Sequence, residues 1–242
     1  MALNDAVHWA ADLGAGVRVA LVQAGTFRSD AGALFGPVPR VLWGRLVADE
    51  IDGEGRLLQA LNCLLIETPA GRVLVETGIG ERLDERGRTW RALAGEPIVP
   101  ALQRAGFEPA SVDIVAMSHL HYDHAGGLLR ADGTRAFPRA RIVAQRAEWE
   151  IALDANPRIV ASYDQPELRL VRAWGEDGGI DTAGSARHRG TGGGRCGSGV
   201  PDEDLVGCVR TWCRRARGGR TEGAEDRKRQ SERQRSEGAA EA

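Results

Sequence analysis

Three of the chain's five histidines lie within six residues of one another near the middle of the sequence, together with an aspartate. They form the pattern His-x-His-x-Asp-His, made by His119, His121, Asp123 and His124. Imidazole nitrogens and carboxylate oxygens are ligands that zinc prefers, and so short a segment can place several of them around one or two ions. The alternative is a polar loop that holds these histidines by chance. We predict a metal site in this segment.

The residues on either side of the segment favour the metal site over the chance interpretation. An apolar run at residues 112–117, interrupted by Asp113, predicts a buried strand that leads directly into it. Gly126 and Gly127 follow the histidines, and glycine allows the chain to turn away behind them. A predicted strand, the candidate ligands and two glycines therefore follow one another along the chain. This is the structural context that a metal-binding motif of this kind requires.

The other predicted elements lie before residue 172, where the chain has the composition of a folded protein. Strands are predicted at residues 17–22, 61–66, 73–75 and 141–144, and helices at residues 98–105 and 145–153. Residues 69–71, Pro-Ala-Gly, are typical of a hairpin turn, and Gly106 is expected to end the first helix. Trp149 lies on the apolar face of the second helix. Strands come first and then alternate with helices, which predicts an α/β (α+β) fold.

Several segments resemble one known family. Residues 118–127, Ser-His-Leu-His-Tyr-Asp-His-Ala-Gly-Gly, resemble the zinc-binding signature of the metallo-β-lactamase superfamily, Thr/Ser-His-x-His-x-Asp-His-x-Gly-Gly. Residues 72–80 resemble the family's strand that ends in Asp-Thr-Gly-x-Gly, with Glu76 at the position of the usual Asp. Residues 26–36, 38–39 and 42–43 are similar to a branch that includes quorum-quenching lactonases. The resemblance continues through residues 137–138, 141–145, 148–150 and 161–163, so it covers about residues 17–170.

The resemblance implies an αββα metallo-β-lactamase sandwich, of which this chain shows the N-terminal half. It also implies that His119 and His121 hold a first zinc ion, and that Asp123 and His124 hold a second. Two zinc ions generate hydroxide from a bridging water near neutral pH, and this hydroxide attacks a carbonyl carbon. Asp123 is then the catalytic residue that passes a proton to the leaving group. The implied partner is a small-molecule substrate, such as an acyl-homoserine lactone.

Composition limits the other classes of function. A length of 242 residues fits one α/β domain with or without a tail, and a net charge of −2 gives no general case for nucleic-acid binding. No apolar run reaches membrane-spanning length, so no membrane partner is expected. Four cysteines are few, and Cys63 is expected to be a buried free thiol, which fits a cytoplasmic location. Residues 1–16 form an N-terminal lead-in without the pattern of a signal peptide, and residues 17–175 form the domain.

The composition changes after Trp174. Residues 176–242 contain few aliphatic side chains, and residues 225–242 are almost entirely Arg, Lys, Glu, Gln, Ser, Gly and Ala. Such a segment cannot bury enough apolar surface to offset the entropy lost on ordering, so we predict a disordered C-terminal tail. Glutamates are interleaved with the arginines, which favours a solvated tail over one that binds acidic surfaces.

The segments that complete the family's metal site are not visible in this tail. They are a His in Thr-Pro-Gly-His, a bridging Asp in a Gly-Asp turn, and a late His. The codons for residues 187–191, Arg-His-Arg-Gly-Thr, permit Thr-Pro-Gly-His when read from the third base of the Arg187 codon. We therefore hypothesise a frameshift near residues 180–183, with a genuinely diverged tail as the alternative. Two functions remain open: a zinc-dependent hydrolase, and a truncated or frameshifted, non-catalytic remnant with a partial metal site.

Overall fold

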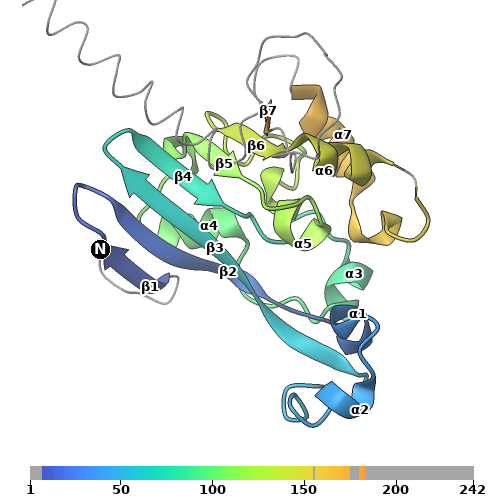
Figure 1. Ribbon diagram of the computed structural model, residues 1–242. Helices are drawn as coiled ribbons and strands as arrows, with labels where there is room; N and C mark the ends of the chain where they lie inside the picture. The colour runs from blue at the N-terminus through green and yellow to red at the C-terminus, as the bar shows by residue number, and fades with distance from the viewer. Residues whose placement is uncertain (1–6, 155, 175–179, 184–242) are drawn as a thin grey trace, which may run out of the picture. The chain divides into compact units, whose positions relative to one another are not determined.

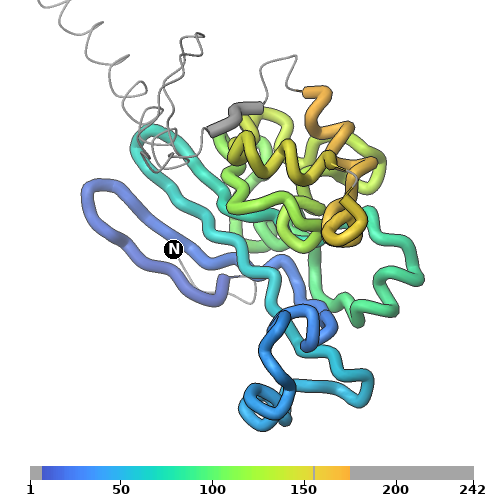
Figure 2. The backbone as a smooth tube through the Cα atoms, turned by 45° about the vertical axis from the view of Figure 1, so that its right-hand side comes forward, coloured from blue at the N-terminus to red at the C-terminus, as the bar shows by residue number. Residues whose placement is uncertain are grey.

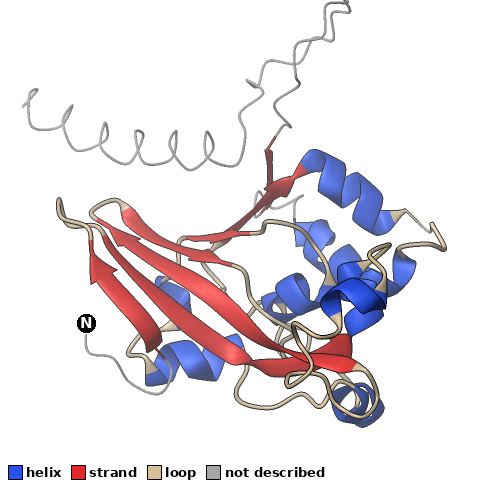
Figure 3. Cartoon of the chain, turned by 60° about the horizontal axis from the view of Figure 1, so that its bottom comes forward, coloured by secondary structure: helices blue, strands red, loops and turns tan. Residues whose placement is uncertain are grey.

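The computed structural model describes residues 7–154, 156–174 and 180–183. Its strands form one sheet in the order of the sequence, and they lie side by side in Figure 3. The strands are β1 (Val7–Asp12), β2 (Arg18–Asp30), β3 (Arg56–Thr68), β4 (Gly71–Val75), β5 (Ile114–Ala116), β6 (Arg141–Gln145) and β7 (Ile180–Ala183). The pairs from β1 to β4 are antiparallel, whereas β4, β5 and β6 are parallel.

The helices are short and lie between the strands along the chain (Figure 1). They are α1 (Ala31–Phe35), α2 (Arg40–Trp43), α3 (Glu85–Trp90), α4 (Ile98–Arg104), α5 (Tyr122–Ala125), α6 (Arg146–Leu153) and α7 (Gln165–Ala173), with 3₁₀ turns η1 (Pro109–Ser111), η2 (Gly126–Leu128) and η3 (Val160–Ser162). Figures 1 and 2 show α1 and α2 at the end of the long β2–β3 ribbon that is far from the β3–β4 turn. The predicted α/β class is confirmed.

The hairpin expected around residues 69–71 is present between β3 and β4. The Thr68 hydroxyl accepts hydrogen bonds from the backbone N–H groups of Ala70 and Gly71, which fixes the turn. The helix expected at residues 98–105 is α4, and Gly106 follows it with a φ of +87°, the left-handed conformation that glycine adopts freely. The second expected helix is α6, and Trp149 is buried on its inner face.

The first strands extend further than the sequence patterns predicted. Strand β2 runs on from residue 22 to Asp30, because an irregularity between Gln23 and Thr26 shifts the register and pairing with β3 then resumes. Strand β1 falls within residues 1–16, the expected lead-in, and pairs antiparallel with β2. Strand β7 falls within the segment expected to be the tail. The remainder of that segment, residues 184–242, lies outside the described residues.

The parallel strands determine where the histidine segment lies. Strand β5 pairs with β4 on one side and β6 on the other, and all three of its residues are buried. Parallel strands have their carboxyl ends at the same edge of the sheet, so Glu76 after β4 and Ser118 near the end of β5 become neighbours. Buried side chains of α4 and α6, including Leu102 and Trp149, belong to the hydrophobic core around these strands. No helix in the described ranges is long and apolar enough to cross a membrane.

Candidate functional site

The segment that carries the predicted ligands leaves the sheet at the carboxyl end of β5. The backbone N–H of Met117 donates to the carbonyl of Val143 in β6, and the next residue is already outside the sheet. His119 lies in the loop that follows, and His121 has an extended backbone immediately before α5. Asp123 and His124 lie within the single turn of α5. The sheet therefore holds one end of the segment, and α5 holds the other.

The structure brings the four predicted ligands together. The ring centroids of His119 and His124 are 3.9 Å apart, and those of His119 and His121 are 4.4 Å apart. The Nε2 atom of His124 lies 3.6 Å from Oδ2 of Asp123. Three imidazoles and a carboxylate thus form one cluster, which we call the histidine cluster, made of His119, His121, Asp123 and His124.

Glu76 supports the histidine cluster from the end of β4. Its Oε1 atom accepts a hydrogen bond of 2.9 Å from the backbone N–H of Ser118, and its Oε2 atom lies 3.1 Å from Nδ1 of His124. An ionised carboxylate can only accept, so Nδ1 of His124 carries the proton of that hydrogen bond. In the neutral ring, the lone pair is then on Nε2, the atom that faces Asp123. A metal-binding imidazole is oriented by a carboxylate in the same way.

The pKa values follow from these contacts. Burial raises the pKa of Glu76, but the hydrogen bonds from His124 and Ser118 outweigh burial, and the pKa lies below its usual value. Burial lowers the pKa of His124, yet the hydrogen bond to Glu76 and the charge of Asp123 raise it overall. The pKa of His119 is lowered, first by burial and then by the neighbouring His124 and His121 rings. His119 and His124 therefore hold protons with different affinities.

Glycines allow the backbone of the residues after β4 to touch the backbone behind α5. The N–H of Gly127 donates to the carbonyl of Gly78, and the carbonyl of His124 accepts from both the N–H and the hydroxyl of Thr77. A Cβ atom on Gly126 would lie 2.2 Å from the carbonyl oxygen of Ile79, a distance too short for any side chain. Gly126 has a φ of −64°, which residues with a side chain also adopt. Glycine is therefore required here by the close approach of the Ile79 backbone, and not by the backbone freedom that was expected to be needed for a turn.

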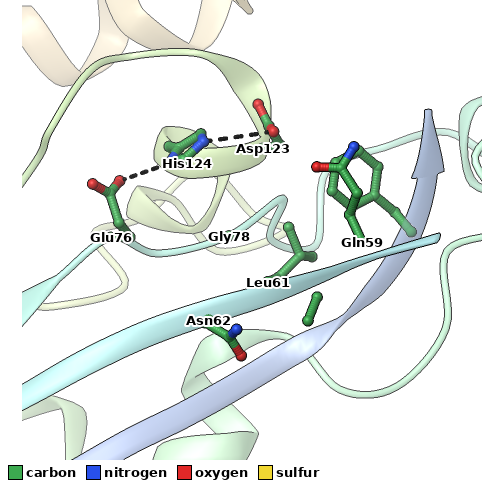
Figure 4. A pocket seen from close by; sticks show the side chains of 9 residues that line it. Gln59, Leu61, Asn62, Glu76, Gly78, Asp123 and His124 are labelled. Atoms are coloured by element: carbon green, nitrogen blue, oxygen red, sulfur yellow. Dashed lines mark hydrogen bonds and ion pairs between the residues drawn. The ribbon is translucent and has the colours of Figure 1, made fainter. Parts of the chain in front are cut away.

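A pocket of about 140 Å³, partly open to solvent, borders the histidine cluster (Figure 4). It is lined by Phe27, Gln59, Ala60, Leu61, Asn62, Glu76, Gly78, Asp123 and His124. Figure 4 shows the dashed contacts that join Glu76 to His124 and His124 to Asp123 on one side of this space, with Leu61 on β3 below them. The pocket thus combines apolar walls, the side-chain amide of Gln59 and part of the cluster. Sequence patterns did not identify Gln59 and Asn62, because alternation along β3 marks only the apolar positions.

Two further residues contact the ligand segment, Glu148 and Tyr163. In the sequence they stood out only as parts of segments that resemble the family. Oε1 of Glu148 accepts a hydrogen bond of 2.9 Å from the backbone N–H of Leu120. The ring of Tyr163 contacts His121, with centroids 4.8 Å apart. Glu148 lies 28 positions from Leu120, and Tyr163 lies 42 positions from His121, so no local pattern reveals these contacts.

The donor set fits zinc by its chemistry. His124 presents Nε2 beside the Asp123 carboxylate, and the His119 ring lies against the rings of both His124 and His121. No three or more His, Cys, Asp or Glu side chains within the described ranges are arranged to enclose an ion. The described residues therefore supply four donor side chains that lie together, and the metal role of each stays a prediction.

Comparisons with known proteins agree with this arrangement. The family model of the metallo-beta-lactamase superfamily matches residues 58–208, more than half of the chain. An N-acyl homoserine lactonase from Bacillus cereus is 32% identical over 130 residues, which cover 49% of this chain and 50% of that protein. The N-acyl homoserine lactonase AttM from Agrobacterium fabrum is 36% identical over 120 residues, 43% of each chain. The chain thus matches about half the length of these relatives.

Solved structures share the fold. A probable metal-dependent hydrolase from Staphylococcus aureus has a TM-score of 0.57 at 27% identity, over 62% of this chain and 55% of that one. AidC, a dizinc quorum-quenching lactonase in complex with a product, has a TM-score of 0.57 at 20% identity, over 77% of this chain and 64% of that one. With the histidine signature at the end of β5 and the family match over residues 58–208, the chain belongs to the metallo-β-lactamase superfamily.

Proposed function

We propose that this chain is a zinc-dependent hydrolase that opens a small carbonyl substrate, with an N-acyl homoserine lactone as the expected substrate class. The observation that carries the proposal is the histidine cluster at the edge of a pocket, with His124 oriented by Glu76 so that Nε2 is available. The similarity to N-acyl homoserine lactonases supports the substrate class.

Each member of the cluster has a role in the proposal. His119 and His121 would hold one zinc ion, and Asp123 and His124 a second. When bound, zinc lowers the pKa of water and polarises a carbonyl oxygen. Water then adds to the lactone carbonyl carbon, its proton passes to the Asp123 carboxylate, and Asp123 returns that proton to the ring oxygen as the carbon–oxygen bond breaks. Atoms balance, because one water is consumed and one hydroxy acid is formed.

The pocket provides a place for such a substrate. Phe27 and Leu61 offer apolar surface, and Gln59 offers an amide group that can form a hydrogen bond to an acyl amide. Asp123 and His124 lie on the wall of this same space, so a bound carbonyl would be next to the groups that act on it.

The test uses the purified chain of 242 residues, supplied with zinc and an N-acyl homoserine lactone. Ring opening is followed by NMR, and the zinc content of the dialysed protein is measured in parallel. The proposal expects hydrolysis that falls at least about 100-fold in Asp123→Asn, because a proton-transfer group typically contributes that much. Asp132→Asn changes an exposed carboxylate elsewhere and should leave the rate unchanged. Little zinc and no hydrolysis would contradict the proposal and support the non-catalytic remnant.

A further inference from the structure

A carboxylate on α6 holds the middle of the ligand segment. Oε1 of Glu148 accepts hydrogen bonds from the backbone N–H of Leu120, at 2.9 Å, and from the hydroxyl of Tyr163, at 3.1 Å. Leu120 lies between His119 and His121, and its side chain is fully buried. Because the backbone on both sides of Leu120 leads directly to a predicted ligand, a fixed Leu120 restricts where those two rings can lie.

Tyr163 connects the same carboxylate to one of the rings. Its ring meets that of His121 edge-on, with centroids 4.8 Å apart and planes at 77°. Burial, together with the charge and the hydrogen bond of Glu148, raises the pKa of Tyr163 to about 12, so the hydroxyl remains a donor at ordinary pH. Aromatic rings are attracted to one another in this edge-on geometry. Glu148 thus holds the Tyr163 side chain at its hydroxyl, and the Tyr163 ring packs edge-on against His121.

The position of Glu148 in the first turn of α6 suggests a simpler role for its carboxylate, as a cap of that helix, which the contacts do not support. Glu148 is the third residue of α6, where an acidic side chain commonly bonds to the first N–H groups of its own helix. Here Oε1 accepts instead from Leu120, 28 positions earlier, and from Tyr163, 15 positions later. The carboxylate therefore links three separate segments: the loop after β5, the start of α6 and the residue after η3.

Glu76 and Glu148 divide the ligand segment between them. Glu76 binds the first residue of the segment, Ser118, and the last ligand, His124. Glu148 binds Leu120, which lies between these two points, before α5 and outside any helix or strand. Without a second support, the stretch from Ser118 to His124 would be held only at its ends.

We propose that Glu148 is a positioning residue that orients His121 for metal binding, through the N–H of Leu120 and through Tyr163. This inference rests on the proposed metal role of the histidine cluster. Partners that orient metal ligands typically contribute about 10–100-fold in metal affinity. Glu148 itself needs no contact with the metal or the substrate to have this effect.

Zinc affinity of the full chain, measured by competition with a chromophoric chelator, tests the inference. Glu148→Ala should weaken zinc binding by about 10–100-fold. Glu148→Gln keeps a carbonyl oxygen as acceptor and should restore affinity to within about threefold, because a neutral acceptor preserves the hydrogen bonds. Glu150→Ala, an exposed carboxylate on the same helix, is the matched control and should leave affinity unchanged. Equal zinc affinity in Glu148→Ala and the unsubstituted chain would overturn the inference.

A measurement without metal separates this inference from the proposed function. NMR of the histidine side chains should show the His121 ring signals shifted in Glu148→Ala and in the milder Tyr163→Phe, with the His124 ring, which Glu76 holds, much less affected. If the unsubstituted chain binds no zinc, the proposed function fails, but the NMR result still decides whether Glu148 orients His121. Unmoved His121 signals in folded Glu148→Ala and Tyr163→Phe proteins would overturn the inference.

Discussion

Oε2 of Glu76 lies 3.1 Å from Nδ1 of His124, although the two residues are 48 positions apart in the sequence. The family resemblance places Asp at position 76, and here the longer Glu side chain reaches both His124 and the N–H of Ser118. Glu76 adopts a φ of +66°, a left-handed conformation that is unfavourable for a residue other than glycine. The site therefore keeps a strained backbone at the residue that orients His124, and such strain is a common feature of functional sites.

Removing the charge of Glu76 should lower the pKa of His124. The hydrogen bond to this carboxylate is the largest of the contributions that raise that pKa, so Glu76→Gln should bring it down. An NMR titration of the His124 ring in metal-free protein measures the change. Glu81→Gln, which alters a carboxylate that pairs with Arg130, is the control and should leave the His124 titration unchanged. A His124 pKa that is the same in Glu76→Gln as in the unsubstituted chain would show that the contact has no electrostatic effect.

Adding one methyl group at Gly126 should destabilise the protein. The new Cβ would lie 2.2 Å from the carbonyl oxygen of Ile79, so the backbone on one side must shift. We expect Gly126→Ala to lower the free energy of unfolding by about 1–3 kcal/mol, the usual cost of overpacking a filled interior. Gly53→Ala is the comparison, because nothing lies within 4 Å of a Cβ at that position. Equal denaturation midpoints for the two variants would contradict the close contact.

Stability should depend on pH through Glu167 in α7. Burial raises the pKa of Glu167 to about 8, with the charge of Asp164 in the same direction and that of Arg82 opposing it. The folded chain then keeps a proton that the unfolded chain loses above its ordinary pKa of 4.5, so the free energy of unfolding falls as the pH rises through this window. The slope from this group is at most about 1.4 kcal/mol per pH unit.

Glu167→Gln is neutral at every pH and should flatten that dependence. Urea denaturation at pH 5, 6.5 and 8 measures the slope, with the exposed Glu150→Gln as the control. The substituted chain should be the more stable of the two at pH 8. A pH slope that Glu167→Gln does not change would mean that the carboxyl group is ionised in the folded protein.

The frameshift hypothesis makes a prediction about the coding DNA. We expect resequencing of the source DNA across codons 174–192 to reveal a missing or extra base near codons 180–183 that restores Thr-Pro-Gly-His. The reason is that the segment after residue 183 is rich in Gly and Arg, as an out-of-frame translation would explain. The segment also carries none of the family's later ligand motifs. An unaltered frame would reject the hypothesis and leave a genuinely diverged tail.

Local patterns were enough to predict the elements next to the ligands. The apolar run before Ser118 predicted β5, and the Pro-Ala-Gly turn predicted the β3–β4 hairpin, because each signal lies within a few neighbouring residues. Helix α7 was not predicted, although Asp164 caps it by accepting from the N–H of Glu167 and Leu168 is buried on its inner face. Its mean polarity is high, and the apolar positions that mark a helix are few.

The contacts that complete the site could not be predicted, because they join distant segments. The Glu76–His124 and Glu148–Leu120 hydrogen bonds depend on which strands are neighbours in the sheet. The strand order places the end of β4 beside the end of β5, and α6 after β6. The sequence therefore indicated the residues that the structure brings together in the histidine cluster, whereas the residues that orient them became apparent only from the parallel arrangement of β4, β5 and β6.

The most direct test of the account is the zinc content of the full chain with and without the histidine cluster. The chain is loaded with zinc, dialysed and analysed for bound metal, beside His121→Ala and the control variant His8→Ala, whose ring lies in β1 outside the cluster. We predict at least one zinc ion per chain in the unsubstituted and His8→Ala proteins, and a clear loss in His121→Ala. Zinc content that is near zero, or that is unchanged in His121→Ala, would contradict the metal role of the cluster.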